Sequence, residues 1–278
     1  MGRLDRSWQL FKQSFAVLAR DPKILVFPLC SGISLVLLGI SFFVPLYRDG
    51  TLQAVAKHKG TWDDYAVLFA WYYLNFLVGI FFNSALMGCA NMRLSGKQPT
   101  VGAGFRMAVD RMGSIAAWAF VAASVGLVLS MLRDRNNKLL SLLSAGLSLA
   151  WSLITYLIVP VLLFEERGVF GSLHRSEELF RSHWGEQVAG NFGFGLLSAV
   201  MSIPAVLLAL GCWRIDPIGG IILAGVYLVI LATLTSAVRG VFTVALYRYA
   251  TGGEAPPGFS AESIDGALGG RARQEWPE

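Results

Sequence analysis

The chain has 278 residues, of which 55% are hydrophobic and only 15% are charged. An ordinary soluble domain carries about 25% charged residues, so this chain has too few to cover a globule of its size. The composition indicates an integral membrane protein and excludes a disordered chain, and three cysteines are too few for a disulfide scaffold. Nucleic acid is not expected as a partner, because the basic residues behind the net charge of +5 are dispersed between apolar runs.

The chain begins with an amphipathic segment in which large apolar residues recur at steps of three and four, the spacing of one helix face. That face holds Leu4, Trp8, Phe11, Phe15 and Leu18. The pair Asp21-Pro22 ends this helix, and two apolar stretches follow, Ile24–Tyr47 and Tyr65–Met92. Each exceeds the roughly 20 apolar residues that a membrane-spanning helix needs. Residues 1–97 are therefore predicted to form a surface helix and a transmembrane hairpin.

The same order recurs twice. A second amphipathic segment, Val101–Met112, precedes the predicted spans Ser114–Leu132 and Leu139–Phe164. A third amphipathic segment, from Phe170 to Trp184, precedes the last two predicted spans, which are Val188–Leu210 and Gly219–Val238, the latter continuing as helix to about Tyr249. The predicted fold is an all-α integral membrane bundle of six transmembrane helices and three amphipathic helices in a threefold pseudo-repeat, with units 1–97, 98–166 and 167–252.

Two further features of the chain bear on this fold. Pro28, Pro160 and Pro204 fall inside predicted spans, where each is expected to kink its helix for packing or for a binding site. Residues 253–278 form a polar tail rich in Gly and Pro that we expect to be mobile, with candidate anchors at Phe259, Ile264 and Leu268.

The distribution of basic residues predicts the orientation of the chain. With the N-terminus inside, the inner segments hold 16 Lys and Arg residues and the outer loops hold 7. The positive-inside rule therefore favours a multi-pass protein with both termini and all three amphipathic helices on the cytoplasmic side.

Amphipathic helices of this kind lie in the headgroup layer, with their basic side chains facing anionic lipid. Residues that could contact lipid or a protein partner are Trp8, Phe11, Phe15, Arg106, Arg111, Arg175 and Arg181. The alternative interpretation is that these helices are topological fixtures that pack against the bundle.

A few polar residues are predicted to lie within or at the ends of spans, where unpaired polar groups are costly. They are Asn75, Asn83, Asn191, Glu165 and Glu166. These residues either line a path through the membrane or bond a neighbouring helix. No span carries an Asp, Lys or His near its middle, which weakens the case for a proton-coupled transporter.

The sequence offers no set of residues for catalysis, metal or cofactor binding. His174 and His183 are nine residues apart, roughly opposite one another on a helix, and neither lies in a His-Glu-x-x-His motif. The sequence has no Gly-x-Ser-x-Gly elbow and no Gly-x-x-x-x-Gly-Lys loop. We therefore expect a protein that is not an enzyme and has no cofactor.

Several short motifs resemble known families. The segment from Pro160 to Arg181, a span that ends in Glu165-Glu166-Arg167 before a short loop and a helix, resembles bacterial multi-pass families related to the glycerophosphodiester phosphodiesterase membrane domain. Two other motifs, Arg6-Ser7-Trp8 with Pro28 and Ala245-Leu-Tyr247-Arg248-Tyr249 before Pro257-Gly258-Phe259, are closer to an uncharacterised six-span family, known as a domain of unknown function. The resemblance implies a bacterial inner-membrane protein and carries over no catalytic residue.

Two functions remain open at this stage. The first is a non-enzymatic protein of the bacterial cytoplasmic membrane that binds lipid, or scaffolds a protein partner or a second copy of itself, through its inner-face helices. The second is a transporter or channel for a small or amphipathic solute.

Overall fold

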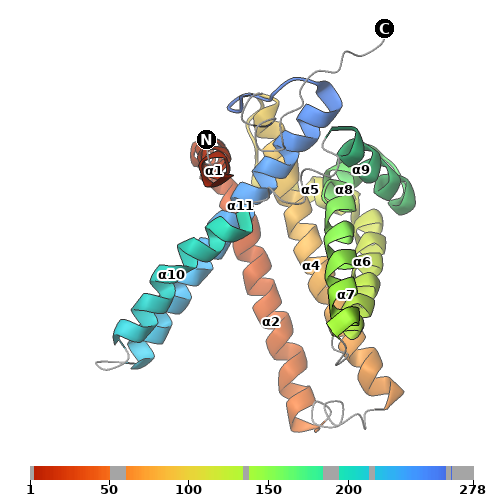
Figure 1. Cartoon of the computed structure of the whole chain (residues 1–278), viewed down its shortest axis with the longest axis vertical. Helices are drawn as coiled ribbons and strands as arrows, with labels where there is room; N and C mark the ends of the chain where they lie inside the picture. The colour runs from red at the N-terminus through yellow and green to blue at the C-terminus, as the bar shows by residue number, and fades with distance from the viewer. Residues whose placement is uncertain are drawn as a thin grey trace. The chain divides into compact units, whose positions relative to one another are not determined.

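The computed structural model describes residues 3–50, 61–133, 138–183, 194–212, 217–260 and 264, and all regular structure in these ranges is helical (Figure 1). The elements in chain order are α1 (Arg3–Arg20), the 3-10 helix η1 (Pro22–Leu25), α2 (Val26–Arg48), α4 (Trp62–Leu94), α5 (Val101–Asp110), α6 (Met112–Arg133), α7 (Lys138–Ile154), α8 (Ile158–Phe164), α9 (Val169–His183), α10 (Phe194–Cys212) and α11 (Pro217–Gly252).

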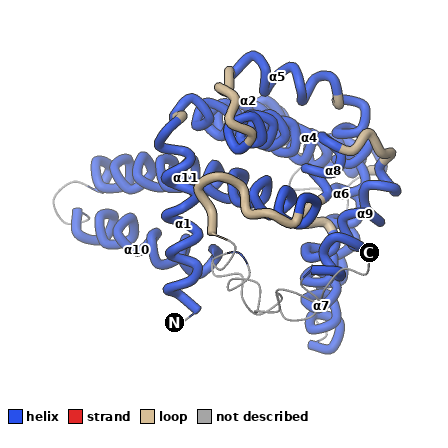
Figure 2. The backbone as a smooth tube through the Cα atoms, turned by 90° about the horizontal axis from the view of Figure 1, so that it is seen from above, coloured by secondary structure: helices blue, strands red, loops and turns tan. Residues whose placement is uncertain are grey.

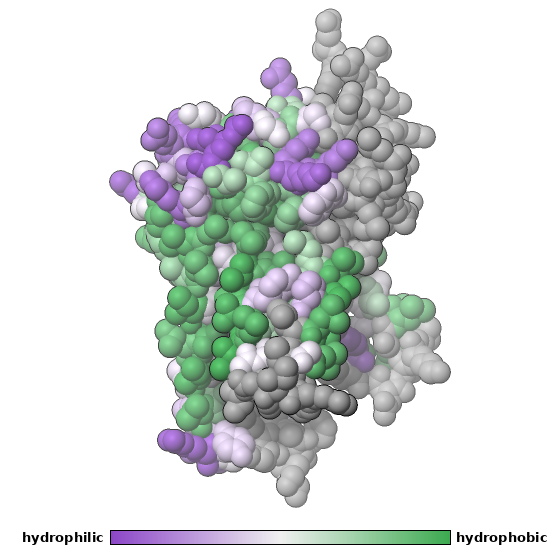
Figure 3. All heavy atoms as spheres, turned by 90° about the vertical axis from the view of Figure 1, so that its left-hand side faces the viewer, coloured by the Kyte–Doolittle hydropathy of each residue, from purple (hydrophilic) through white to green (hydrophobic). Residues whose placement is uncertain are grey.

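Five stretches of the described helices are long and apolar enough to cross a membrane. They are Pro22–Arg48, Trp62–Leu94, Met112–Arg133, Leu142–Phe164 and Ile222–Gly252. The other predicted span, Val188–Leu210, begins outside the described residues and continues as α10, so six spans remain a prediction. Figure 3 shows hydrophobic side chains over much of the face that it draws. These observations are compatible with a multi-pass membrane protein.

The predicted span Leu139–Phe164 is interrupted rather than merely kinked. Helix α7 ends at Ile154, residues 155–157 form a turn, and α8 begins at Ile158. The break places Pro160 in the first turn of α8, where a residue without an N–H group costs no helical hydrogen bond. By contrast, α10 is continuous across Pro204.

The described chain groups into two compact units that are not the predicted repeats. The first unit comprises residues 1–26, 86–101 and 177–278, and the second comprises residues 27–85 and 102–176. Each unit combines segments that are distant in the sequence, so the threefold repeat is not confirmed.

The first unit is organised around the C-terminal half of α11. Helix α1 runs across the hairpin of α10 and α11 and contacts both (Figure 2). Residues 241–247 of α11 and 86–90 of α4 are buried. Beyond α11, Pro256, Phe259 and Ile264 are buried as well. The start of the predicted tail is thus part of the packed structure of this unit.

The second unit has a core made by α6, α8 and their neighbours. Trp118, Ala122, Ile158 and Leu162 are buried together, and Trp151 of α7 stacks on Trp118 with ring centroids 5.7 Å apart. Helix α5 is fixed by Phe105, whose ring contacts those of Phe27, Phe81 and Phe82.

Candidate functional site

Helix α1 packs through a face that shares Leu18 with the predicted one but is not centred on its aromatic residues. Among residues 8–20, the part of α1 whose side chains the structure describes, the buried residues are Leu10, Ser14, Val17 and Leu18, each at most 4% exposed. Their spacing of four, three and one residues defines a single helix face, and this is the part of α1 that the first unit covers.

The three predicted aromatic residues of α1 form a separate surface, which we call the aromatic ridge. Trp8 stacks on Phe11 with ring centroids 5.5 Å apart, and Phe11 stacks on Phe15 at 6.2 Å. Trp8 and Phe15 are 41% and 42% exposed. The Lys12 ammonium lies 5.3 Å from the centre of the Trp8 ring. The ridge therefore combines exposed aromatic area with a cation at its edge.

Helices α5 and α9 also expose large apolar side chains. On α5 and the start of α6, Val109 is 57% exposed and Met112 is 39% exposed, while Gly104 and Ala108 face the interior. On α9, Phe170 is 77% exposed. Only part of the apolar face predicted for each of these helices is therefore covered by the protein.

The four arginines predicted to contact lipid differ in their surroundings. Arg111 forms an ion pair with Glu166 at 2.7 Å, and Arg181 pairs with Glu177 at 2.8 Å. Arg175 lies 3.4 Å from Glu165, which also pairs with Arg167 at 3.0 Å. These contacts place Glu165 and Glu166 at the connection between α8 and α9.

Arg106 is the exception within this set. It is exposed, and within the described ranges it forms no ion pair. Its charge is therefore available to a headgroup without breaking a contact inside the protein.

Of the three predicted intramembrane asparagines, the structure describes Asn75 and Asn83, and both belong to α4. The Asn75 amide donates a hydrogen bond to the Trp71 carbonyl of its own helix at 2.7 Å. Asn83 is half-buried on the same helix, and Asn191 lies outside the described residues. The Asn75 side-chain amide thus finds a hydrogen-bond acceptor within α4.

Sequence reasoning missed two polar contacts. In the second unit, buried Ser176 of α9 bonds backbone groups on both sides of the α7–α8 break. In the first unit, Arg248 of α11 bonds the Asn91 side chain at 3.1 Å and also the Ser95 hydroxyl. A signal for Ser176 was available, because it shares a helix face with the buried Leu179 and Phe180.

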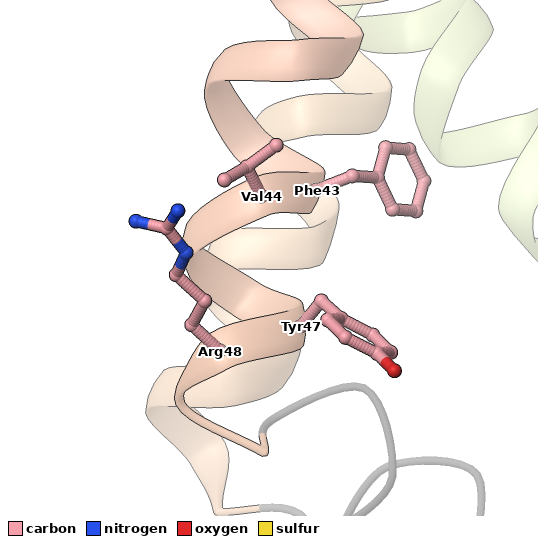
Figure 4. Close-up of a pocket in the computed structure, with 4 residues that line it drawn as sticks. All are labelled: Phe43, Val44, Tyr47 and Arg48. Atoms are coloured by element: carbon pink, nitrogen blue, oxygen red, sulfur yellow. The ribbon is translucent and has the colours of Figure 1, made fainter.

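The described part of the chain holds no cluster of metal-ligating side chains, because no three His, Cys, Asp or Glu side chains lie together there in a group that could hold a metal ion. A hollow of about 350 Å³ is lined by Phe43, Val44, Tyr47 and Arg48 (Figure 4). All four belong to two successive turns of α2, so it is a shallow depression beside one helix.

The chain belongs to a family of unknown function, DUF6159, whose model matches residues 63–258. This match covers more than half of the chain and confirms the expectation of an uncharacterised family. It does not extend to the glycerophosphodiester phosphodiesterase membrane-domain families. No curated protein and no solved structure matches the chain.

Proposed function

We propose that this protein is a non-enzymatic, multi-pass protein of the bacterial cytoplasmic membrane that binds anionic lipid through its amphipathic helices. The observation that carries the proposal is the aromatic ridge of α1, where stacked Trp8, Phe11 and Phe15 lie beside Lys12. Tryptophan and phenylalanine are favoured on the apolar face of interfacial helices, and lysine is favoured beside phosphate headgroups.

The packing of α1 supports this role. Burial of Leu10, Val17 and Leu18 holds the helix against α11 and α10, and the ridge lies on a different side. A helix held in place in this way loses less conformational entropy when it meets the membrane than a free peptide does. Transfer of a large side chain from water to lipid contributes up to about 1.5–3 kcal/mol, less for residues already half-covered.

Exposed cations supply the selectivity for anionic lipid in this proposal. Lys12 is exposed on α1, and Arg106 is exposed on α5. Each cation near an anionic leaflet contributes about 1 kcal/mol, which corresponds to roughly a fivefold change in binding. The ion-paired Arg111, Arg175 and Arg181 contribute less, because their charges are offset within the protein.

Transport of a small or amphipathic solute is the second candidate. The interrupted span formed by α7 and α8 favours it, because discontinuous helices form the substrate sites of many transporters. The bond of Asn75 to its own helix weighs against a path lined by that residue.

The proposal is tested by measuring the anionic phospholipid that stays with the full chain during mild detergent purification. Combining Trp8→Ser, Phe15→Ser and Lys12→Gln should reduce this amount severalfold, because it removes both the aromatic area and the adjacent charge. The matched control is Ala16→Ser, at an exposed position of α1 on a side of the helix away from the ridge, and it should leave retention unchanged.

Spin labels give an independent measurement of the depth of α1. Labels at positions 8 and 15 should be accessible to oxygen dissolved in the bilayer, whereas a label at position 16 should be accessible to an aqueous nickel chelate. Unchanged lipid retention in the ridge variant, together with nickel accessibility at positions 8 and 15, would rule out the lipid-binding proposal.

A further inference from the structure

The break between α7 and α8 leaves backbone groups without their usual helical partners, and one side chain binds them. The Ser176 hydroxyl donates a hydrogen bond to the Ile154 carbonyl at 2.6 Å and accepts one from the Leu157 N–H group at 3.2 Å. Ser176 belongs to α9, and its exposed fraction is 0%. A single buried hydroxyl thus bonds both sides of the interrupted span.

The local sequence explains why the helix needs this contact. Pro160 has no N–H group, so an unbroken helix would leave the Tyr156 carbonyl without its bond from residue 160 and would bring the proline ring against that carbonyl. The chain forms a turn at residues 155–157 instead. Because water is scarce at membrane depth, the groups released by the turn need partners from the protein.

The segments on the two sides of the break differ in what they pack against. In α8, Ile158, Val161 and Leu162 are at most 1% exposed. In α7, Leu142 is 72% exposed and Leu147 is 53% exposed. The other end of α8 is joined to α9 by the ion pair of Glu165 and Arg175. Helices α8 and α9 are therefore joined on one side of the break, whereas α7 on the other side packs along α6, with Trp151 against Trp118, and otherwise faces outward.

From this arrangement we infer that residues 155–157 form a hinge in the fourth span and that the Ser176 hydroxyl is its latch. With the latch closed, α7 keeps one direction relative to α8 and α9. Without it, the Ile154 carbonyl and the Leu157 N–H group must find other partners, and α7 adopts several directions. Ser176 acts as a positioning residue, and this role does not depend on lipid binding by α1.

The inference is tested by electron paramagnetic distance measurements on the full chain in lipid nanodiscs. One spin label replaces Leu142 on α7 and the other replaces Phe170 on α9, since both positions are exposed. Cys30 and Cys212 are first changed to Ala, and Cys89 is kept because it is only 1% exposed. A reference pair of labels at Val109 and Phe170 measures a distance within the second unit that does not involve α7.

Two serines of α9 provide a matched comparison. Ser172 and Ser176 are both 0% exposed, but Ser172 donates to the Arg167 carbonyl at 3.3 Å, in the segment just before its own helix. Ser176→Ala should broaden the 142–170 distance distribution or add a second maximum. Ser172→Ala should leave that distribution as narrow as in the original chain, and Ser176→Thr, which keeps a hydroxyl, should do the same. The reference distance should not change in any of these variants.

The latch is refuted if Ser176→Ala leaves the 142–170 distribution unchanged, if Ser172→Ala broadens it equally, or if the reference pair broadens with it. If Ser176→Ala fails to fold, Pro160→Ala provides the second test. Alanine at position 160 has an N–H group, so a continuous helix can form across residues 155–157 and no latch is needed. The combined variant Pro160→Ala with Ser176→Ala should then fold and give a narrow distribution. Its failure to fold would overturn the inference.

Discussion

At the scale of single residues, Gly258 lies where the chain packs against α1 after the end of α11. Gly258 has a φ of +96°, a left-handed backbone conformation that residues with a Cβ atom rarely adopt. A Cβ atom at this position would lie 3.1 Å from the Cγ2 atom of Val17. The neighbouring Pro256 and Phe259 are buried, so the backbone here has little room to adjust.

Gly258→Ala should therefore destabilise the protein by about 1–3 kcal/mol, which thermal unfolding in detergent would measure. Gly252→Ala is the matched control, because Gly252 ends α11 and a Cβ atom there meets nothing within 4 Å. Alanine is the better helix former, so this change should be neutral or slightly stabilising. Equal unfolding temperatures for the two variants would show that the backbone conformation of Gly258 and its contact with Val17 do not limit stability.

At the scale of elements, α1 has two apolar surfaces with different roles. One holds Leu10, Val17 and Leu18 and joins the helix to the first unit. The other is the aromatic ridge, which the unit leaves partly exposed. The two surfaces make separate predictions, because the first is covered by the protein and the second is partly exposed.

Changing Leu10 and Leu18 together to Ala should lower the stability of the purified protein strongly, since a buried leucine typically contributes about 2–5 kcal/mol. Trp8→Ala with Phe15→Ala should have a much smaller effect, because both side chains are about two-fifths exposed. The measurement is the midpoint of thermal unfolding in one detergent. A larger loss from the aromatic pair would mean that the ridge, and not the leucine face, holds α1 in place.

At the scale of the whole molecule, the distribution of charge predicts the orientation in the membrane. The predicted inner segments hold 16 basic residues against 7 in the outer loops. Apolar helices do not fix this orientation, because they can span a bilayer in either direction. The prediction that both termini are cytoplasmic therefore rests on the positive-inside rule.

In intact cells, an impermeant maleimide should label Lys57→Cys and should not reach Arg106→Cys until the membrane is permeabilised. Both variants are made without Cys30 and Cys212, so that the label reports on the introduced thiol. Labelling of position 106 in intact cells would reverse the orientation and would move the exposed Arg106 away from the anionic cytoplasmic leaflet.

The sequence by itself determined the features that depend on composition and local pattern. Sparse charge and long apolar runs indicated an all-helical membrane protein, and a helical period of apolar residues located α1, α5 and α9. These features were predictable because they follow from solvation and from hydrogen bonds between near neighbours in the chain.

Only the tertiary structure decided which surfaces meet. The pattern grouped Trp8, Phe11 and Phe15 with Leu18, but packing on α11 selected a face centred on Leu10 and Val17. Likewise, Pro160 predicted a distortion, whereas the turn at residues 155–157 and its bonds to Ser176 depend on α9, about twenty residues away in the chain. Such contacts join residues far apart in sequence, and no local period encodes them. For the same reason, sequence could not tell the ion-paired Arg111 from the exposed Arg106.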